Sequence, residues 1–141
     1  MIKEISNNDA MVTKQLSIFL ENRGGRLSEL SEILAAENIN FSAWSLAETE
    51  EFGILRTIVS DPERACEILK KKHFAATLTD VVKFSVPDRP GALCSILQVL
   101  SQNGVFIEYM YSFSAEGGVA WVIMRPRDVA HCEAVLKTIP E

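Results

Sequence analysis

The sequence has little of what marks secreted, membrane or nucleic-acid-binding proteins. It contains three cysteines, and its first residues lack the apolar run of a signal peptide, so we expect reduced thiols and a cytoplasmic location. No stretch approaches the roughly 20 apolar residues that a membrane-spanning helix needs. The net charge is −5, and basic residues cluster only at 70–72, where they suit the end of a helix. We therefore expect neither a membrane nor a nucleic acid as a partner.

Groups suited to catalysis or metal binding are also scarce. The chain has two histidines, and no pair of His and Cys has the spacing of metal ligands. Cys132 directly follows His131, and adjacent residues point to different sides of a helix. Cys66 and Cys132 stand beside apolar residues, so we expect both to be buried as small apolar side chains. The sequence thus predicts no catalytic residue, no metal site and no cofactor, and the protein is expected not to be an enzyme.

What the sequence does contain is an internal repeat. When the chain is shifted by 66 residues, residues 16–27 fall on residues 82–93, and the match continues without a gap over about fifty positions. The coinciding residues include Arg23 with Arg89, Gly25 with Gly91, Leu27 with Leu93, and Cys66 with Cys132. Such a duplication predicts two copies of one structural unit. We divide the chain into an amino-terminal extension at 1–13, a first repeat at 14–80 and a second repeat at 81–141.

Each repeat has the pattern of a small α+β unit. In the first repeat we expect strands at 14–21, 39–47, 52–59 and 74–79, with a helix after the first strand and another opened by Pro62. In the second we expect strands at 81–86, 105–114 and 119–125, a helix at 91–102 and a last helix through 129–139. Asn38 and Gly104 stand where each first helix would end in a left-handed conformation. The order is βαββαβ, which predicts ferredoxin-like antiparallel sheets with both helices on one face.

The second repeat stops before its closing strand. The first strand of this repeat would then have an exposed edge, which proteins normally cover. We expect the cover to be the amino-terminal extension, the other repeat or a second chain. The last possibility favours a homodimer.

The strand-to-helix loop of each repeat is the predicted ligand site. In the second repeat, Val82, Phe84 and Val86 alternate with polar residues as in a strand with one buried face. We expect Pro90 to begin the helix and Gly91 to allow a tight bend. The free N–H groups of such a helix N-terminus would suit a carboxylate.

These segments resemble a pair of ACT domains. The resemblance is carried by DRPGAL at 88–93 after a strand, by its copy NRGGRL at 22–27, and by INF at 39–41. The resemblance extends over nearly the full length. It implies a regulatory protein that binds a free amino acid where the loop of one domain approaches a strand of its partner, with no cofactor.

The resemblance also implies a set of binding residues. They are Asn22, Arg23, Gly24, Gly25, Arg26, Leu27 and Asn40 in the first repeat, and Asp88, Arg89, Pro90, Gly91, Ala92, Leu93 and Phe106 in the second. If the sites bridge the repeats, the Asp88 loop would meet Asn40 and the Asn22 loop would meet Phe106. We expect the first site to be the tighter one, with Gly91, Ala92 and Leu93 as main-chain donors.

Simpler roles exist for several of these residues. Asp88 could cap its helix, and Asn40 could be a turn residue. Arg23 and Arg89 could merely be solvated, and we expect Trp44 to lie in the core or at a domain interface. The sequence therefore leaves two functions open. One is a sensor of a free amino acid that signals to a metabolic enzyme, and the other is a regulatory subunit of an enzyme that acts by protein contact with degenerate ligand sites.

Overall fold

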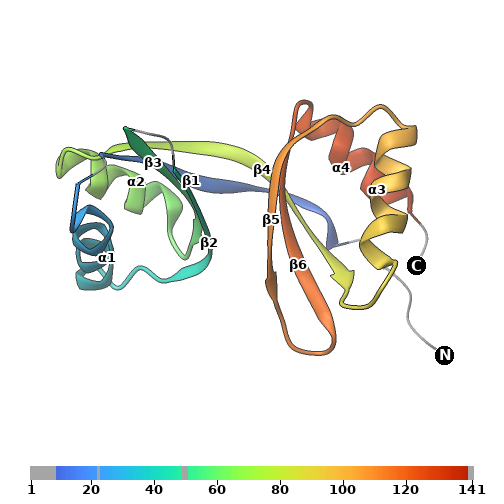
Figure 1. The fold of residues 1–141 in the computed structure, drawn as a ribbon, viewed down its shortest axis with the longest axis horizontal. Helices are drawn as coiled ribbons and strands as arrows, with labels where there is room; N and C mark the ends of the chain where they lie inside the picture. The colour runs from blue at the N-terminus through green and yellow to red at the C-terminus, as the bar shows by residue number, and fades with distance from the viewer. Residues whose placement is uncertain (1–8, 22, 49–50, 140–141) are drawn as a thin grey trace. The chain divides into compact units, whose positions relative to one another are not determined.

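The computed structural model describes residues 9–21, 23–48 and 51–139 (Figure 1). The elements in chain order are β1 (Met11–Glu21), α1 (Arg26–Ala36), β2 (Phe41–Glu48), β3 (Phe52–Val59), α2 (Pro62–Lys71), β4 (Ala75–Pro87), α3 (Ala92–Gln102), β5 (Ile107–Ser114), β6 (Val119–Pro126) and α4 (Val129–Thr138). Contacts divide the chain into a first unit, residues 14–79, and a second unit, residues 80–139 together with 9–13.

The first unit is a ferredoxin-like unit. Its strand order is β2-β3-β1-β4, and β3 pairs antiparallel with both β1 and β2. Helices α1 and α2 lie on one face of these strands (Figure 1). Leu16, Ile18 and Leu20 on alternate positions of β1 pack against Leu30 and Leu34 of α1 in one apolar core. The predicted α+β fold is confirmed here.

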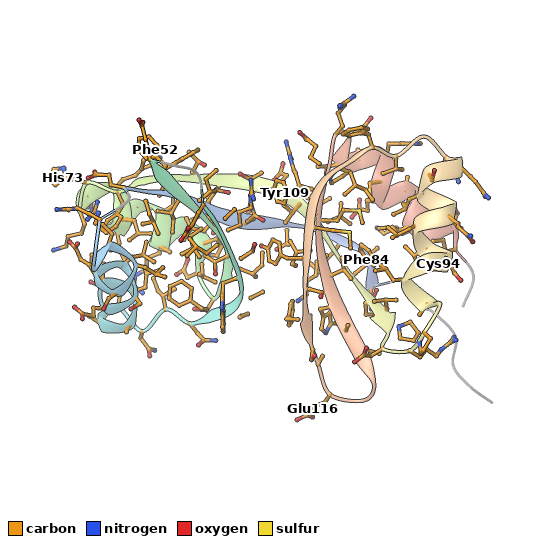
Figure 2. The ribbon with its side chains drawn as sticks, viewed as in Figure 1. Phe52, His73, Phe84, Cys94, Tyr109 and Glu116 are labelled. Atoms are coloured by element: carbon orange, nitrogen blue, oxygen red, sulfur yellow. The ribbon has the colours of Figure 1, made fainter. Side chains whose placement is uncertain are left out.

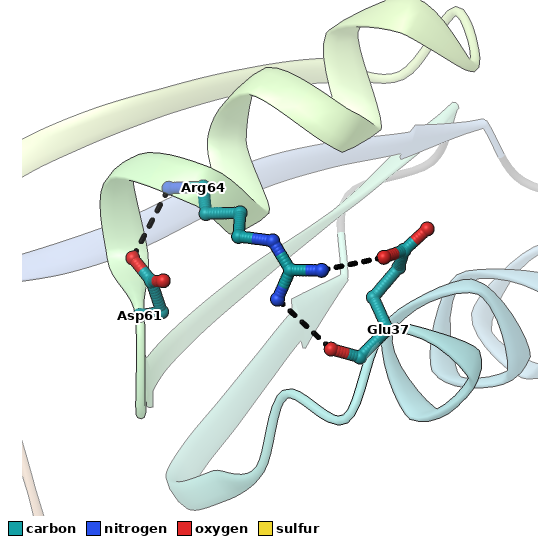
Figure 3. A network of polar contacts seen from close by, with 3 residues as sticks. All are labelled: Glu37, Asp61 and Arg64. Carbon is teal, nitrogen blue, oxygen red and sulfur yellow. Dashed lines mark hydrogen bonds and ion pairs between the residues drawn. The ribbon is translucent and has the colours of Figure 1, made fainter.

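Arg64 ties the two helices of the first unit together (Figure 3). Its guanidinium donates to the Glu37 carboxylate at 2.6 Å and to the Glu37 main-chain oxygen at 3.0 Å. Asp61, directly before α2, accepts a hydrogen bond from the Arg64 N–H at 3.4 Å. The end of α1 is thereby linked to the beginning of α2, where Pro62 stands as predicted.

The second unit repeats this plan with strand order β1-β4-β6-β5. Strand β6 pairs antiparallel with β4 and β5, and Phe84 lies fully buried in the core beneath α3 and α4 (Figure 2). Cys94 is exposed on α3, and Glu116 lies at the tip of the β5–β6 hairpin (Figure 2). Cys66 and Cys132 are buried, as predicted.

The start of β1 takes the place of the closing strand that the second repeat lacks. Ala10 is 2% exposed and belongs to the core of the second unit. Asp9 accepts hydrogen bonds from the main-chain N–H and from the hydroxyl of Ser85 in β4. The Val12 N–H donates to Glu133 of α4 at 3.1 Å. Of the three covers expected for this edge, the structure has the amino-terminal segment.

Several boundaries differ from the sequence-based prediction, among them the first residues of β2 and β5, which lie two positions later than expected. The strands expected at 74–79 and 81–86 are one strand, β4, because Asp80 between them does not break the extended backbone. Strand β1 begins at Met11, earlier than expected. Helix α3 begins at Ala92, so the prediction that Pro90 opens it is wrong, because Gly91 has a left-handed φ of 87° that a helix cannot include. The left-handed conformations predicted for Asn38 and Gly104 are confirmed, with φ of 58° and 72°.

Candidate functional site

The strand-to-helix loops of the two units are structural copies. Gly25 and Gly91 precede α1 and α3 with φ of 85° and 87°. Each loop also has the same internal hydrogen bond, from Arg23 N–H to the Glu21 oxygen at 2.8 Å and from Arg89 N–H to the Pro87 oxygen at 2.9 Å. The repeat inferred from the sequence therefore extends to backbone geometry.

Within the described residues, neither helix N-terminus is capped by a side chain. The residue that precedes each helix is a glycine, and no described side chain caps α1 or α3. Asp88 is exposed and does not cap α3, so the simpler role considered for it is not seen. Of the donors predicted on α3, Ala92 already donates to the Arg89 oxygen at 3.3 Å. An uncapped N-terminus carries unpaired N–H groups and a positive partial charge, both of which favour an anion.

A hollow lies beside each loop, within its own unit. The Arg26 hollow, of about 110 Å³, is lined by Leu20, Glu21, Arg23, Arg26, Leu27, Leu46, Glu48, Phe52 and Gly53. The Asp88 hollow, of about 190 Å³, is lined by Val86, Pro87, Asp88, Arg89, Leu93, Met110, Ser112, Ala120 and Val122. Their linings correspond largely through the 66-residue repeat, because in both the loop and the first strand face the hairpin that follows the helix.

The hollows contain part of the predicted set of residues. Predicted residues that line them are Arg23, Arg26 and Leu27 in one, and Asp88, Arg89 and Leu93 in the other. Gly24, Gly25, Asn40, Pro90, Gly91, Ala92 and Phe106 are not among the lining residues. Asn22 lies outside the described residues. The pairing of the Asp88 loop with Asn40, and of the Asn22 loop with Phe106, joins different units and stays a prediction.

The two residues predicted to face the loops differ in their surroundings. Asn40 is exposed, and its main chain exchanges two hydrogen bonds of 3.0 Å with Ser60, one to the Ser60 hydroxyl and one from the Ser60 N–H. Phe106 is 54% exposed, and the Arg127 guanidinium stacks on its ring at 3.9 Å. The Asn40 side chain remains exposed, whereas one face of the Phe106 ring is covered.

The carboxylates of the Arg26 hollow were not foreseen from the sequence. Glu48 ends β2 and Glu21 ends β1, and both converge on the hollow with Arg23 and Arg26. Arg23 is exposed and forms an ion pair with Glu21 at 3.7 Å. The alternation of buried and exposed positions along β1 and β2 is the sequence signal that could have placed Glu21 and Glu48 on one face. The loop motif does not include these two residues.

Arg26 is the buried cation of this hollow. Its residue is 8% exposed, its guanidinium stacks on the Phe74 ring at 3.7 Å, and its Nη1 donates to Glu29 at 3.1 Å. The Nε atom is buried and has no hydrogen-bond partner in the described part of the chain. The equivalent residue of the second unit is Ala92.

The described residues contain no group of three or more His, Cys, Asp and Glu side chains that could hold a metal ion. Within residues 9–21, 23–48 and 51–139, none of the helices combines the length and apolar character of a bilayer-spanning helix.

Several solved structures are similar to this chain. A protein from Bacteroides thetaiotaomicron is 58% identical, with a TM-score of 0.86 over 92% of this chain and 89% of that one. The ligand-free regulatory subunit of aspartate kinase from Thermus thermophilus is 14% identical, with a TM-score of 0.62 over 94% and 97%. Aspartokinase III of E. coli, in complex with lysine and aspartate, is 14% identical, with a TM-score of 0.50 over 91% of this chain and 31% of that one.

No curated protein matches the sequence. The family described as the ACT domain pair matches residues 11–138, which include both units and both loops. The matched length, the duplicated βαββ core and the paired glycine bends agree, and the chain belongs to the ACT domain pair family.

Proposed function

We propose that this protein is a regulatory module that senses a free amino acid at its strand-to-helix loops. The observation that carries the proposal is the pair of matching hollows, each beside a helix N-terminus that no described side chain caps. An amino acid needs a donor set for its carboxylate and an oxygen for its ammonium. The loops offer the first, and Asp88 or the glutamates of the Arg26 hollow offer the second.

The relatives give independent support. Several proteins that share the fold are regulatory subunits of aspartate kinase or aspartokinases, and one of these holds lysine and aspartate. A free amino acid is therefore the first ligand class to test. A metabolic enzyme is the first class of partner to which the signal would pass.

The proposal is tested by melting the protein with each common amino acid at millimolar concentration. A ligand present at about 100 times its dissociation constant adds about 2.7 kcal/mol to the free energy of unfolding. For a chain of this size we expect the melting temperature to rise by roughly 5 to 10 °C. The D-enantiomer of the best ligand is the matched control. An unchanged melting temperature with every amino acid would contradict sensing.

Two substitutions locate the sites. If Asn40 or Asp88 contacts the ligand, Asn40→Ala or Asp88→Asn should weaken binding by about tenfold, since a hydrogen bond to a charged group contributes about 1.5 to 3 kcal/mol. Isothermal titration calorimetry measures the affinity. An affinity equal to that of the natural protein would remove the substituted residue from the site.

A second candidate is a regulatory subunit that acts by protein contact, with its ligand sites degenerate. It is favoured by an apolar groove of about 500 Å³ in the first unit, between α1 and β2. Trp44 is 66% exposed there, and Leu27 and Leu46 are also exposed. Of the two positions expected for Trp44, the core is wrong and the domain interface stays a prediction. Large exposed apolar side chains in one place are typical of docking surfaces. Co-purification of a larger enzyme without any amino-acid response would favour this candidate.

A homodimer remains part of the proposal, on changed grounds. The open edge that suggested it is covered by the start of β1. The exposed apolar side chains near β2, an edge strand of the first unit, now support association. Light scattering after size exclusion would distinguish a dimer from a monomer of 15.7 kDa.

A further inference from the structure

Arg26 is buried at a position where the fold itself does not require an arginine. It is the first residue of α1, and the matching position on α3 is Ala92, which serves the same backbone geometry. A guanidinium loses its hydration when it is buried, so such residues are normally fully paired. The first unit therefore retains a buried cation that its copy lacks.

Within the described residues, the pairing of this cation is incomplete. A guanidinium has five N–H donors. Glu29 accepts from Nη1, the Phe74 ring covers one face, and the buried Nε–H donates to no acceptor among the described residues. Glu29 accepts from Nη1 only, so the Nε–Nη2 edge has no carboxylate partner among the described residues. Two adjacent N–H groups on such an edge match the two oxygens of a carboxylate.

The surroundings of Arg26 indicate what else the ligand would carry. Glu21 and Glu48 line the same hollow and can accept hydrogen bonds from an ammonium group. Leu27, Leu46 and Phe52 supply apolar surface. At about 110 Å³, the hollow is smaller than the roughly 300 to 1,000 Å³ of drug-sized ligand sites, and it suits a small molecule.

We propose that the Arg26 hollow binds the carboxylate of a small free amino acid through the Nε–Nη2 edge of Arg26, with Glu21 and Glu48 facing its ammonium group. This inference rests on the proposed function and assigns the binding of the ligand carboxylate to Arg26. The two loops are then unequal. The first unit holds the carboxylate-binding arginine, whereas the sequence favoured the Asp88 loop as the tighter site.

The affinity test uses the amino acid that stabilises the protein most in the melting series. Arg26→Gln should weaken its binding by about tenfold to hundredfold, since two charge-assisted hydrogen bonds are lost. Arg26→Lys keeps the positive charge but lacks the two parallel N–H donors of the guanidinium, so we expect an intermediate loss of affinity. Arg64→Gln removes another arginine of the same unit, away from the hollow, and should change the affinity by less than about twofold.

A direct reading on the natural protein avoids any folding defect of the variants. The ¹H–¹⁵N resonance of the Arg26 Nε–H should shift when the amino acid is added. It should not shift with the carboxamide of the same amino acid, which lacks the carboxylate. A purely structural Arg26 would change the melting temperature of the free variants and leave both the affinity and this resonance unmoved, which would overturn the proposal.

The failure of amino-acid sensing can be told apart from the failure of this site. If an amino acid binds equally well to Arg26→Gln, sensing stands and the Arg26 site is wrong. If no amino acid binds, sensing is wrong, and acetate becomes the probe. A shift of the Arg26 Nε–H resonance with acetate would support a carboxylate site by itself, and no shift would overturn it.

Discussion

Gly25 and Gly91 make the same backbone bend in the two units, and replacing either should cost stability for the same reason. Both have a left-handed φ, and a Cβ added at either would meet no atom within 4 Å. The cost of Gly25→Ala or Gly91→Ala is therefore backbone strain alone, roughly 1 to 2 kcal/mol. Urea unfolding measures the loss.

Gly24 provides the matched control for this prediction. It neighbours Gly25 and also has open space around it, but it does not have the left-handed φ. Gly24→Ala should leave the free energy of unfolding unchanged or raise it by about 0.4 to 1 kcal/mol, because alanine restricts the unfolded chain. Equal losses for Gly24→Ala and Gly25→Ala would show that the bend is not the cause.

Cys132 gives a pH dependence whose direction follows from its burial. Burial raises the pKa of its thiol from 9.0 to about 11. Between these pH values the folded protein keeps a proton that the unfolded chain has lost. The contribution of this thiol to stability is therefore complete below pH 9 and disappears as the pH rises through 11.

The measurement is the free energy of unfolding at several pH values across this range. It should fall less steeply in Cys132→Ala than in the natural protein. Cys94→Ala, which changes an exposed thiol, should keep the natural slope. If Cys132→Ala shows the natural slope as well, another group causes the decline.

Single residues also show where sequence reasoning succeeds and where it stops. Asn38, Gly104 and Gly91 were assigned to left-handed or bent positions because their residue types tolerate these conformations, and the structure agrees. The loop motif is the sequence feature that singles out Arg26. Its burial depends on Phe74, which is far away along the chain, and no local pattern encodes that contact.

At the scale of elements, a contact between residues far apart along the chain determines which segment covers the edge of β4 in the second unit. The missing closing strand of the second unit was predicted from the repeat, but its replacement was one of three alternatives. The deciding contact joins Asp9 to Ser85, 76 residues later. Periodicity and turn signals describe neighbours along the chain, so they cannot select such a partner.

The amino-terminal cover can be removed by one substitution. Ala10 is 2% exposed in the core of the second unit, so Ala10→Asp would bury a carboxylate without a partner. We expect a loss of about 2 to 4 kcal/mol and faster hydrogen exchange at the amides of β4. Mass spectrometry of peptides from β4 measures the rate of this hydrogen exchange.

Met11→Asp tests the same change one residue away. Met11 is 50% exposed, so the carboxylate of the introduced aspartate would stay in water. We expect the free energy of unfolding to change by no more than about 0.5 kcal/mol. If Ala10→Asp leaves the exchange of β4 unchanged, the segment does not protect that edge.

At the scale of the whole molecule, the repeat was the most informative feature of the sequence. It predicted two βαββαβ units, the second without its closing strand, and the family match agrees. The sequence did not show that the closing strand of the first repeat and the opening strand of the second are one strand. Asp80 is a poor strand former but not a breaker, so the boundary looked sharper than it is.

The continuity of β1 and β4 leads to a prediction about unfolding. Each strand contributes residues to both units, and units of about 66 residues are near the lower limit for independent stability. We therefore expect one cooperative transition. Leu34→Ala and Leu100→Ala, at matching buried positions of α1 and α3, should each lower the stability of the whole chain by about 2 to 5 kcal/mol.

Each unit carries one tryptophan, which makes this prediction measurable. With Trp121→Phe the fluorescence reports on Trp44 in the first unit, and with Trp44→Phe it reports on Trp121 in the second. Leu34→Ala should shift both fluorescence transitions equally, as should Leu100→Ala, because a two-state protein gives coincident curves with every probe. Glu32→Ala, on the exposed side of α1, should shift neither. If Leu34→Ala shifts only the Trp44 transition, the units unfold independently and the shared strands do not couple them.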